Sequence, residues 1–356
     1  MLNTQYRTHM LESQRGFGLV ELMVAVVVGL MAILAIMSVF VTSEAQKRTT
    51  TGGADAQENA VISLVTLERD LRVAGLGLVG LGCNSIAAYN ATLIPSTFTF
   101  APLPVTITRD APAVGNDTIV VAYSTSAYGN IPTSLKGAMP TSDAPLTAAI
   151  GDGFVQGDII MISEPPKACA LVQASANAVN SATGWTLAHD SGAPYPFNPP
   201  AATNIFPAGG YQTGARVTNM GALIRREYFV QNSSLMVRNL NIPDSAVAPL
   251  NPMSIVNGVT AMRAQYGRDT NADGYIDVYD NTAPADPAQL VAVRIAVAAR
   301  SGQLEKDVVS PATLTLWNGG TIADGGAIAL DATAQRYRYK VHQTTVPLRN
   351  VIWTNN

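Results

Sequence analysis

Oxygen-bearing side chains recur at close spacing in the segment DTNADGYIDVYD, residues 269–280. Counted from Asp269, oxygen donors stand at positions one, three, five, nine and twelve, with Gly274 at position six. Calcium prefers carboxylate and carbonyl oxygens, and a glycine at position six permits the sharp turn of a twelve-position calcium loop. The segment therefore predicts a Ca²⁺ site. The expected ligands are Asp269, Asn271, Asp273, Tyr275 through its backbone carbonyl, Asp277 and Asp280.

Two features of this segment depart from an EF-hand. Position twelve is Asp280, which is shorter than the usual glutamate, and strand-like sequence precedes the loop instead of a helix. The alternative is a hairpin turn rich in aspartate and asparagine that holds no metal. Five donor side chains in register favour calcium, bound weakly, with the role of stiffening a connection between strands.

Other patterns that carry chemistry do not fit an active site. The glycines of residues 75–80 have the spacing of a dinucleotide fingerprint, but they follow a helical segment instead of a strand. Asp152 and Asp158 fit turns, and the three histidines are scattered, which argues against a histidine metal site. The net charge is -3 and no basic run follows residue 48, which argues against nucleic-acid binding. The sequence predicts a protein that is not an enzyme.

A long apolar segment near the N-terminus indicates a membrane helix. From Leu22 to Val41 the only polar side chain is Ser38. A helix of about 20 such residues matches the ~30 Å hydrocarbon core of a bilayer. Arg7 and Arg15 precede the segment, so we expect a single-pass protein of the inner membrane with a cytoplasmic N-terminus and a periplasmic C-terminal domain.

The residues before this helix form a polar leader that stops at Gly16. A secretory signal would have a shorter apolar region and a cleavage site at its far end. The pattern RGFGLVELMVA instead resembles the prepilin signal of type IV pilins and of type II secretion pseudopilins. The resemblance implies that residues 1–16 are removed by a prepilin peptidase, which cuts after Gly16 and methylates Phe17.

Glu21 places a carboxylate at the start of the apolar helix. Such a charge is costly in a membrane unless it has a partner, although a residue near the helix end can also reach the headgroups. Glu21 is the fifth residue after the expected cut, where the resembling families keep a glutamate. The resemblance implies that Glu21 pairs with the α-amine of Phe17 on a neighbouring subunit during assembly.

The two cysteines, Cys83 and Cys169, suggest one disulfide because export exposes them to an oxidising compartment. The alternative is a pair of unrelated buried thiols.

Three further segments follow the leader: a membrane and assembly helix over residues 17–42, its soluble half over 43–80, and a β-rich domain over 81–356. Gly52-Gly53 is expected to bend or interrupt the helix. Beyond it, apolar residues recur at helical spacing until Gly75, a plausible stop. These residues are Val61, Leu64, Leu67, Leu71 and Ala74.

Beyond residue 80, short β-rich runs alternate with clusters of proline, glycine, asparagine and aspartate. The clearest runs are Val105–Thr108, Thr118–Ser124, Asp158–Ser163, Ala170–Ala174, Ile224–Val230, Leu235–Leu240, Val259–Tyr266, Leu290–Ala298 and Tyr337–Val346. Residues 231–234 resemble a hairpin turn, and the long loop 194–214 is expected at the surface with little share in the core. The predicted fold class is α+β, with the long helix packed on a predominantly antiparallel sheet.

Four segments resemble the PilW family of minor pilins: QENAVISLVTLERDLRVAG, IVNGVTAMRAQYG, LVAVRIAVAARS and YRYKVHQTTVPLRN. The resemblance implies a subunit that helps to initiate type IV pilus assembly at the pilus tip and then resides in the pilus at the cell surface. The implied partners are other minor and major pilins, the prepilin peptidase, the inner-membrane assembly platform and a tip adhesin.

Two alternatives stay open at this point. The first is a minor pseudopilin of a type II secretion system, because the N-terminal motif is shared between the two systems. The second, a calcium-dependent adhesin module carried on a pilus, rests on the calcium-type loop.

Overall fold

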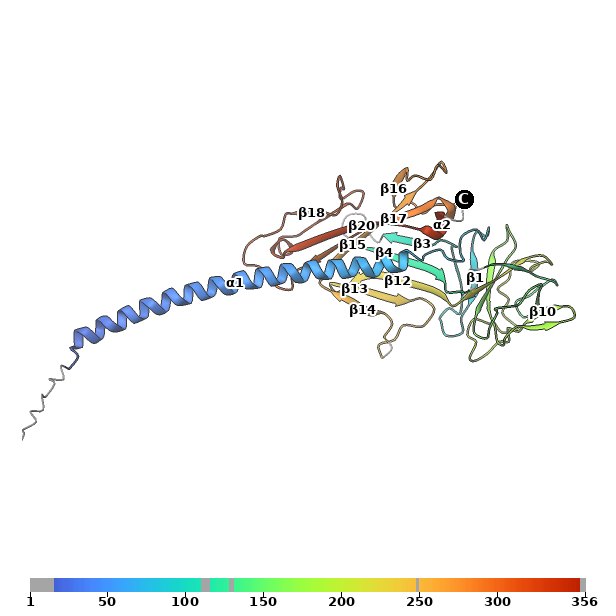
Figure 1. Cartoon of the computed structure of the whole chain (residues 1–356), viewed down its shortest axis with the longest axis horizontal. Helices are drawn as coiled ribbons and strands as arrows, with labels where there is room; N and C mark the ends of the chain where they lie inside the picture. Colours follow the sequence, from blue (N-terminus) through green and yellow to red (C-terminus); the bar gives the residue numbers. More distant parts are fainter. Residues whose placement is uncertain (1–15, 110–115, 128–130, 248–249, 353–356) are drawn as a thin grey trace, which may run out of the picture. The chain divides into compact units, whose positions relative to one another are not determined.

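The computed structural model describes residues 16–109, 116–127, 131–247 and 250–352, which form two compact units, one up to Thr51 and one from Gly52 (Figure 1). The helix α1 (Leu19–Leu71) begins in the first unit. Its side chains from Leu19 to Val41 are exposed, as expected of a segment whose surroundings lie outside the chain. Among the described residues, α1 alone is long and apolar enough to cross a membrane.

The second unit holds the described strands and the remaining helices. The strands are β1 (Ile86–Tyr89), β2 (Thr97–Phe100), β3 (Val105–Arg109), β4 (Asp117–Ser124), β5 (Thr133–Ser134), β6 (Leu146–Ala148), β7 (Ile159–Ser163), β8 (Cys169–Gln173), β9 (Val179–Ser181), β10 (Gly184–Leu187), β11 (Arg216–Gly221), β12 (Leu223–Gln231), β13 (Ser234–Asn239), β14 (Met253–Asn257), β15 (Val259–Arg268), β16 (Val278–Asp280), β17 (Leu290–Arg300), β18 (Thr313–Thr315), β19 (Ala327–Ala329) and β20 (Tyr339–Pro347). The helices are η1 (Pro287–Gln289), η2 (Ala334–Arg336) and α2 (Arg349–Ile352).

These strands form several sheets, and all pairs but β1–β8 are antiparallel, which confirms the predicted α+β class. The larger sheets have the orders β2-β1-β8-β7-β11-β5, β14-β13-β12-β4-β3 and β16-β15-β17-β20. Two small sheets are β6-β10-β9 and β18-β19. Each of the nine strand segments predicted from sequence overlaps one of these strands.

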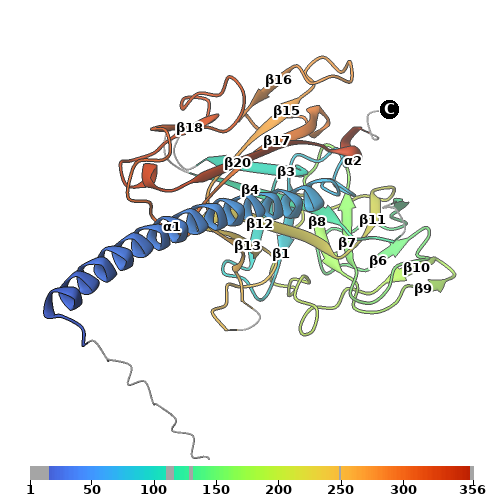
Figure 2. The same ribbon diagram turned by 60° about the vertical axis from the view of Figure 1, so that its left-hand side comes forward.

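The part of α1 in the second unit packs on these sheets (Figure 2). Its buried apolar residues are Ala56, Ala60, Leu64, Leu67 and Leu71. This spacing matches the predicted helical period, except that Val61 is 40% exposed and Ala60 takes its place in the stripe. The buried stripe is what holds the helix against the strands.

The expected interruption at Gly52-Gly53 is wrong, because α1 continues through both residues. A Cβ on Gly52 would lie 3.1 Å from Cβ of Ser301, whereas one on Gly53 would meet nothing within 4 Å. Packing therefore offsets the low helix propensity of glycine, about 1 kcal/mol per residue. The helix also ends earlier than predicted, at Leu71, and Gly75 with φ of 81° lies in the turns that follow.

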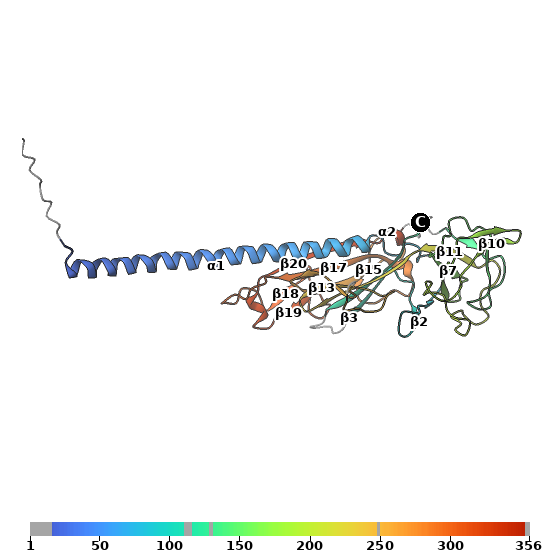
Figure 3. The same ribbon diagram turned by 90° about the horizontal axis from the view of Figure 1, so that it is seen from below.

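The β16-β15-β17-β20 sheet is covered on both faces (Figure 3). Met262 and Ile295 point to the core shared with α1 and the neighbouring sheet. Ala261 and Ala296 face the opposite way and pack against Trp317 from the long excursion between β17 and β20. The central strands β15 and β17 are accordingly buried almost throughout.

The sheets built from β5 to β11 enclose a separate hydrophobic core at one end of this unit (Figure 1). The loop 194–214, expected at the surface, contributes to it: Tyr211 is completely buried and Phe206 is 7% exposed. The expectation for this loop is therefore wrong. Tyr211 donates its hydroxyl to the carbonyl of Ala168 at 2.6 Å, which satisfies the polar end of an otherwise apolar anchor.

The predicted hairpin at residues 231–234 is confirmed. β12 and β13 pair in register up to Gln231 opposite Ser234. Asn232 and Ser233 have φ of 51° and 56°, the positive values that a tight hairpin turn requires at both central positions.

Candidate functional site

The expected cleavage site and Glu21 lie at the start of the first unit. Phe17 is 81% exposed and stands two residues before α1 begins. A cut after Gly16 would therefore leave the whole of α1 on the mature chain. Glu21 lies in the first turn of α1, where a carboxylate opposes the positive end of the helix dipole. It is exposed and makes no ion pair within the described residues.

The structure joins Cys83 and Cys169 in a disulfide, so the sequence correctly paired them. Cys83 follows the turns after α1, and Cys169 is the first residue of β8. Both are buried. The bond attaches the end of the helical segment to the middle of the six-stranded sheet.

The calcium-type loop connects β15 to β16. Asp269 is only 7% exposed, and its two carboxylate oxygens accept hydrogen bonds from the backbone N–H groups of Ala272, at 2.7 Å, and Gly274, at 2.8 Å. Gly274 has φ of 88°, as the predicted sharp turn requires. Position one of the loop is thus inside the turn and shapes its backbone.

Three other expected ligands, Asn271, Asp273 and Asp277, follow Asp269 in the sequence and lie close to one another. The side-chain amide nitrogen of Asn271 lies 3.2 Å from Oδ2 of Asp273 and 3.5 Å from Oδ1 of Asp277. The hydroxyl and the backbone N–H of Thr270 both donate to Asp277 and lower its pKa, so this carboxylate stays ionised. The amide nitrogen of Asn271 therefore faces the two carboxylates, while its side-chain oxygen accepts from the backbone N–H of Asp273 at 3.0 Å.

Asp280 differs from the other donors. It lies in β16, and its carboxylate pairs with the guanidinium of Arg268 on β15. In this arrangement the carboxylate is held by Arg268, and it does not complete the donor set as position twelve of a calcium loop must. Within the described residues, no group of three or more histidines, cysteines and acidic residues is placed to hold a metal. At positions one and nine, Asp269 and Asp277 accept hydrogen bonds from groups of the loop itself.

Asp70, which the sequence analysis did not single out, fastens α1 to the five-stranded sheet. Its carboxylate accepts from Tyr228 at 2.7 Å and from Nη1 of Arg226 at 2.9 Å, and Tyr123 lies 3.4 Å away. Burial first, and then the hydrogen bond to Asp70, raises the pKa of Tyr228. The available signal was a carboxylate in the apolar stripe of the helix, three residues after Leu67.

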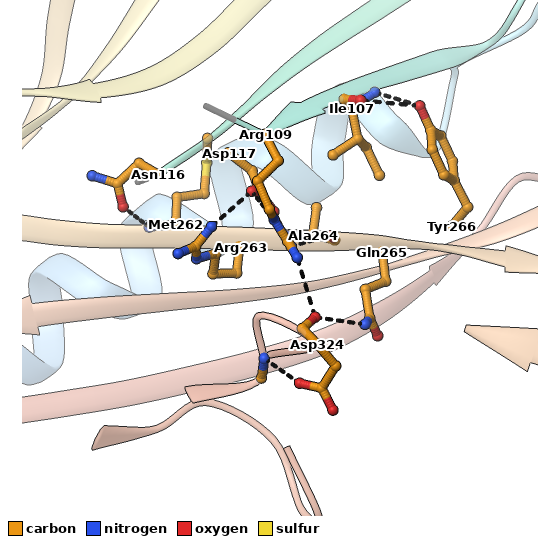
Figure 4. A network of polar contacts seen from close by, with 11 residues as sticks. Ile107, Arg109, Asn116, Asp117, Met262, Arg263, Ala264, Gln265, Tyr266 and Asp324 are labelled. Carbon is orange, nitrogen blue, oxygen red and sulfur yellow. Dashed lines mark hydrogen bonds and ion pairs between the residues drawn. The ribbon is translucent and has the colours of Figure 1, made fainter. Parts of the chain in front are cut away.

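A second buried carboxylate, Asp117, joins two sheets (Figure 4). Arg109 on β3 binds it with two nitrogens, each at 2.7 Å. From β15, Arg263 donates at 3.1 Å and the backbone N–H of Ala264 at 2.8 Å. Arg109 also donates to the carbonyl of Asp324, which fixes the excursion between β17 and β20. The network is a structural joint, because every oxygen of Asp117 already has partners.

Part of the chain matches a known protein family. Residues 226–350 match the family described as PilW, type IV pilus-assembly protein W. This range spans β12 to β20, including the calcium-type loop and most of the residues around Asp70 and Asp117. No curated protein matches the chain significantly.

Among solved structures, a type IV-like pilin from Thermus thermophilus is similar, with 10% sequence identity and a TM-score of 0.37. The alignment covers 83% of this chain and 96% of that one.

Proposed function

We propose that this chain, whose residues 226–350 match the PilW family of type IV pilus-assembly proteins, is a minor pilin that helps to initiate pilus assembly at the pilus tip. The family match over residues 226–350 carries this proposal. The apolar, exposed part of α1 supports it, because a single N-terminal span suits a membrane-anchored pilus component. A role at the tip involves contact with other minor and major pilins and with the inner-membrane assembly platform.

Deletion of the gene tests this function. Cells without it should lose surface pili and twitching, and the intact gene should restore both. Normal piliation with impaired protein secretion would instead favour a type II pseudopilin. Normal piliation with lost adhesion would favour an adhesin module carried on the pilus.

We expect the chain to be processed after Gly16, because the polar leader ends there and Phe17 is exposed before the helix. Mass spectrometry of the purified protein should find methylated Phe17 as the first residue. The same preparation from cells without prepilin peptidase should retain residues 1–16. An N-terminus inside the apolar run of wild-type protein contradicts this processing.

We also propose that the 269–280 loop binds calcium, using Asp269, Asn271, Asp273, Asp277 and the carbonyl of Tyr275. The convergence of Asn271 with Asp273 and Asp277 supports this. Asp280 would have to exchange Arg268 for the ion, or water would take its place. Calcium would supply a central charge that holds the loop between β15 and β16 in one conformation.

A further inference from the structure

Arg225 on β12 stands apart from the other arginines of the described chain. It is partly buried, yet its guanidinium makes no hydrogen bond and no ion pair with any described residue. The remaining described arginines without a polar partner, Arg69 and Arg349, are exposed to solvent. Those two side chains are open to water, whereas the side chain of Arg225 is partly covered by the protein.

Two neighbouring aromatic rings lie against the Arg225 guanidinium. Its central carbon lies 4.1 Å from the ring centroid of Phe100 and 5.2 Å from that of Phe98. Both rings belong to β2, the edge strand of the six-stranded sheet. An aromatic ring attracts a cation through its π-electrons, but it offers the N–H groups of a guanidinium no conventional acceptor. The rings therefore leave those donors without acceptors.

Other described arginines that pack on aromatic rings have the hydrogen-bond acceptor that Arg225 lacks. Three of them also stack on aromatic rings, namely Arg238, Arg294 and Arg300. Each has an acceptor as well: Arg238 has Glu227, Arg294 has Gln265 and Arg300 has Ser233. Among the arginines that the structure describes, each one that packs on an aromatic ring also has a polar partner, except Arg225.

The electrostatics agree with this difference. Burial lowers the pKa of Arg225 to about 10, and no acidic side chain in the described part of the chain acts on it in the opposite direction. A charge that is taken out of water without a counter-charge is costly, so the site favours an anion from outside the chain. No lysine or second arginine contributes there either. A single positive charge suits a carboxylate, whereas phosphate commonly collects several cations.

We propose that Arg225, framed by Phe98 and Phe100, binds an acidic side chain of a partner protein. The planar guanidinium presents two parallel N–H groups to a carboxylate, and the rings pack against the methylenes that carry it. β2 has a hydrogen-bonded neighbour on one side only, the arrangement to which a partner segment can add. This inference does not depend on the proposed role in pilus assembly, because it concerns binding by the isolated chain.

The test uses the full chain in detergent micelles and end-blocked tripeptides as probes. Saturation-transfer NMR should detect binding of Ala-Glu-Ala but not of Ala-Gln-Ala. Arg225→Gln should lower the affinity for the glutamate peptide by about tenfold or more, because a charge-assisted hydrogen-bonded pair is lost. Arg225→Lys should bind with intermediate affinity, since it keeps the charge and loses the fork. Arg238→Gln is the matched control, because it removes a stacked arginine that already has a partner, and should bind like wild type.

Several outcomes would overturn the proposal. Wild-type protein that does not distinguish the glutamate from the glutamine peptide has no carboxylate site. Equal binding by Arg225→Gln places the site elsewhere. Inorganic phosphate that binds more tightly than the glutamate peptide and displaces it makes this a phosphate site. Circular dichroism and melting of each variant check folding. If Arg225→Gln does not fold, the affinities of Arg225→Lys and Phe100→Leu for the glutamate peptide are measured instead. Wild-type affinity in both variants would refute the proposed site.

Discussion

Glu21 and Asp70 lie on the same helix, yet their carboxylates meet different surroundings. Asp70 is buried and satisfied within the chain by Arg226 and Tyr228. Glu21 is exposed and has no ion-pair partner among the described residues. A carboxylate next to a membrane-length apolar segment needs a counter-charge, so the partner of Glu21 is expected on another chain. Arg225 likewise has no ion-pair partner among the described residues, but its charge is positive.

Glu21→Ala should leave membrane insertion intact and weaken incorporation into the pilus. Removing the carboxylate makes the helix more apolar, so insertion does not suffer. The α-amine of a neighbouring Phe17 loses its counter-charge in a dry bundle, at a cost of about 3–5 kcal/mol. Recovery with other pilins from detergent extracts should fall by about tenfold or more while membrane levels hold.

Glu44→Ala on the same helix is the control, because Glu44 pairs with Arg48 at an exposed position and should be recovered like wild type. Equal recovery of Glu21→Ala and wild type would refute the pairing role.

At the scale of elements, α1 shows how packing overrides local preference. Two consecutive glycines predict a break, but the helix continues because its buried stripe from Ala56 to Leu71 is fixed on the sheets. Gly52 has a separate reason to be glycine, the 3.1 Å approach to Ser301. A side chain at Gly52 would therefore crowd Ser301, whereas one at Gly53 would meet no neighbour.

Gly53→Ala should stabilise the protein by about 0.5–1 kcal/mol, because alanine is the better helix former and nothing lies in its way. Gly52→Leu should destabilise it by about 1–3 kcal/mol, because the larger side chain is forced against Ser301. Thermal melting of the full chain in detergent measures both. Similar shifts in the two variants would mean that α1 does not approach Ser301 closely.

The β15–β16 loop should make stability depend on calcium. With a dissociation constant of about 10⁻⁴–10⁻³ M, as in extracellular modules, 10 mM calcium adds about 1–3 kcal/mol to the free energy of unfolding. Wild-type protein should melt lower in chelator than in calcium. Asp269→Ala with Asp273→Ala should melt low in both, because the ion has lost two carboxylates.

Asp143→Ala with Asp152→Ala removes the same charge from exposed positions outside the loop and should keep the calcium response. A wild-type transition that millimolar calcium leaves unmoved would reduce the loop to a turn.

At the scale of the whole molecule, the second unit is held together by a few long-range joints. The disulfide attaches the segment after α1 to β8, and Asp117 attaches the five-stranded sheet to the four-stranded one. Asp117 links two sheets that do not share hydrogen-bonded strands, whereas the disulfide reinforces the place where β1 already pairs with β8. Losing one should loosen the packing of layers without removing the sheets.

The Cys83–Cys169 bond should form in the exported protein. Its two residues are 86 positions apart, and closing so long a loop contributes about 4–5 kcal/mol in the chain-entropy model. Reduction, or Cys83→Ser with Cys169→Ser, should lower the free energy of unfolding by up to that amount. Alkylation should label both thiols only after reduction, and labelling of the native protein without reductant would exclude the bond.

The sequence alone determined the features that depend on neighbouring residues. The membrane-length apolar run, the helical stripe around Leu64 and Leu67, the hairpin at 231–234 and the nine strand segments were all predicted from local spacing. The cysteine pair followed from count and compartment, without geometry. These signals are local because hydrogen-bonding period, span length and turn chemistry are set within a few residues.

Only the tertiary structure decided which distant residues meet. Asp70 and Tyr228 are 158 positions apart, and nothing in the sequence marks them as partners. The continuity of α1 through Gly52, the burial of Tyr211 and the pairing of Asp280 with Arg268 were likewise set by packing between layers. Burial and charge pairing depend on which surfaces the folded chain brings together, and a single sequence records those contacts only through the fold.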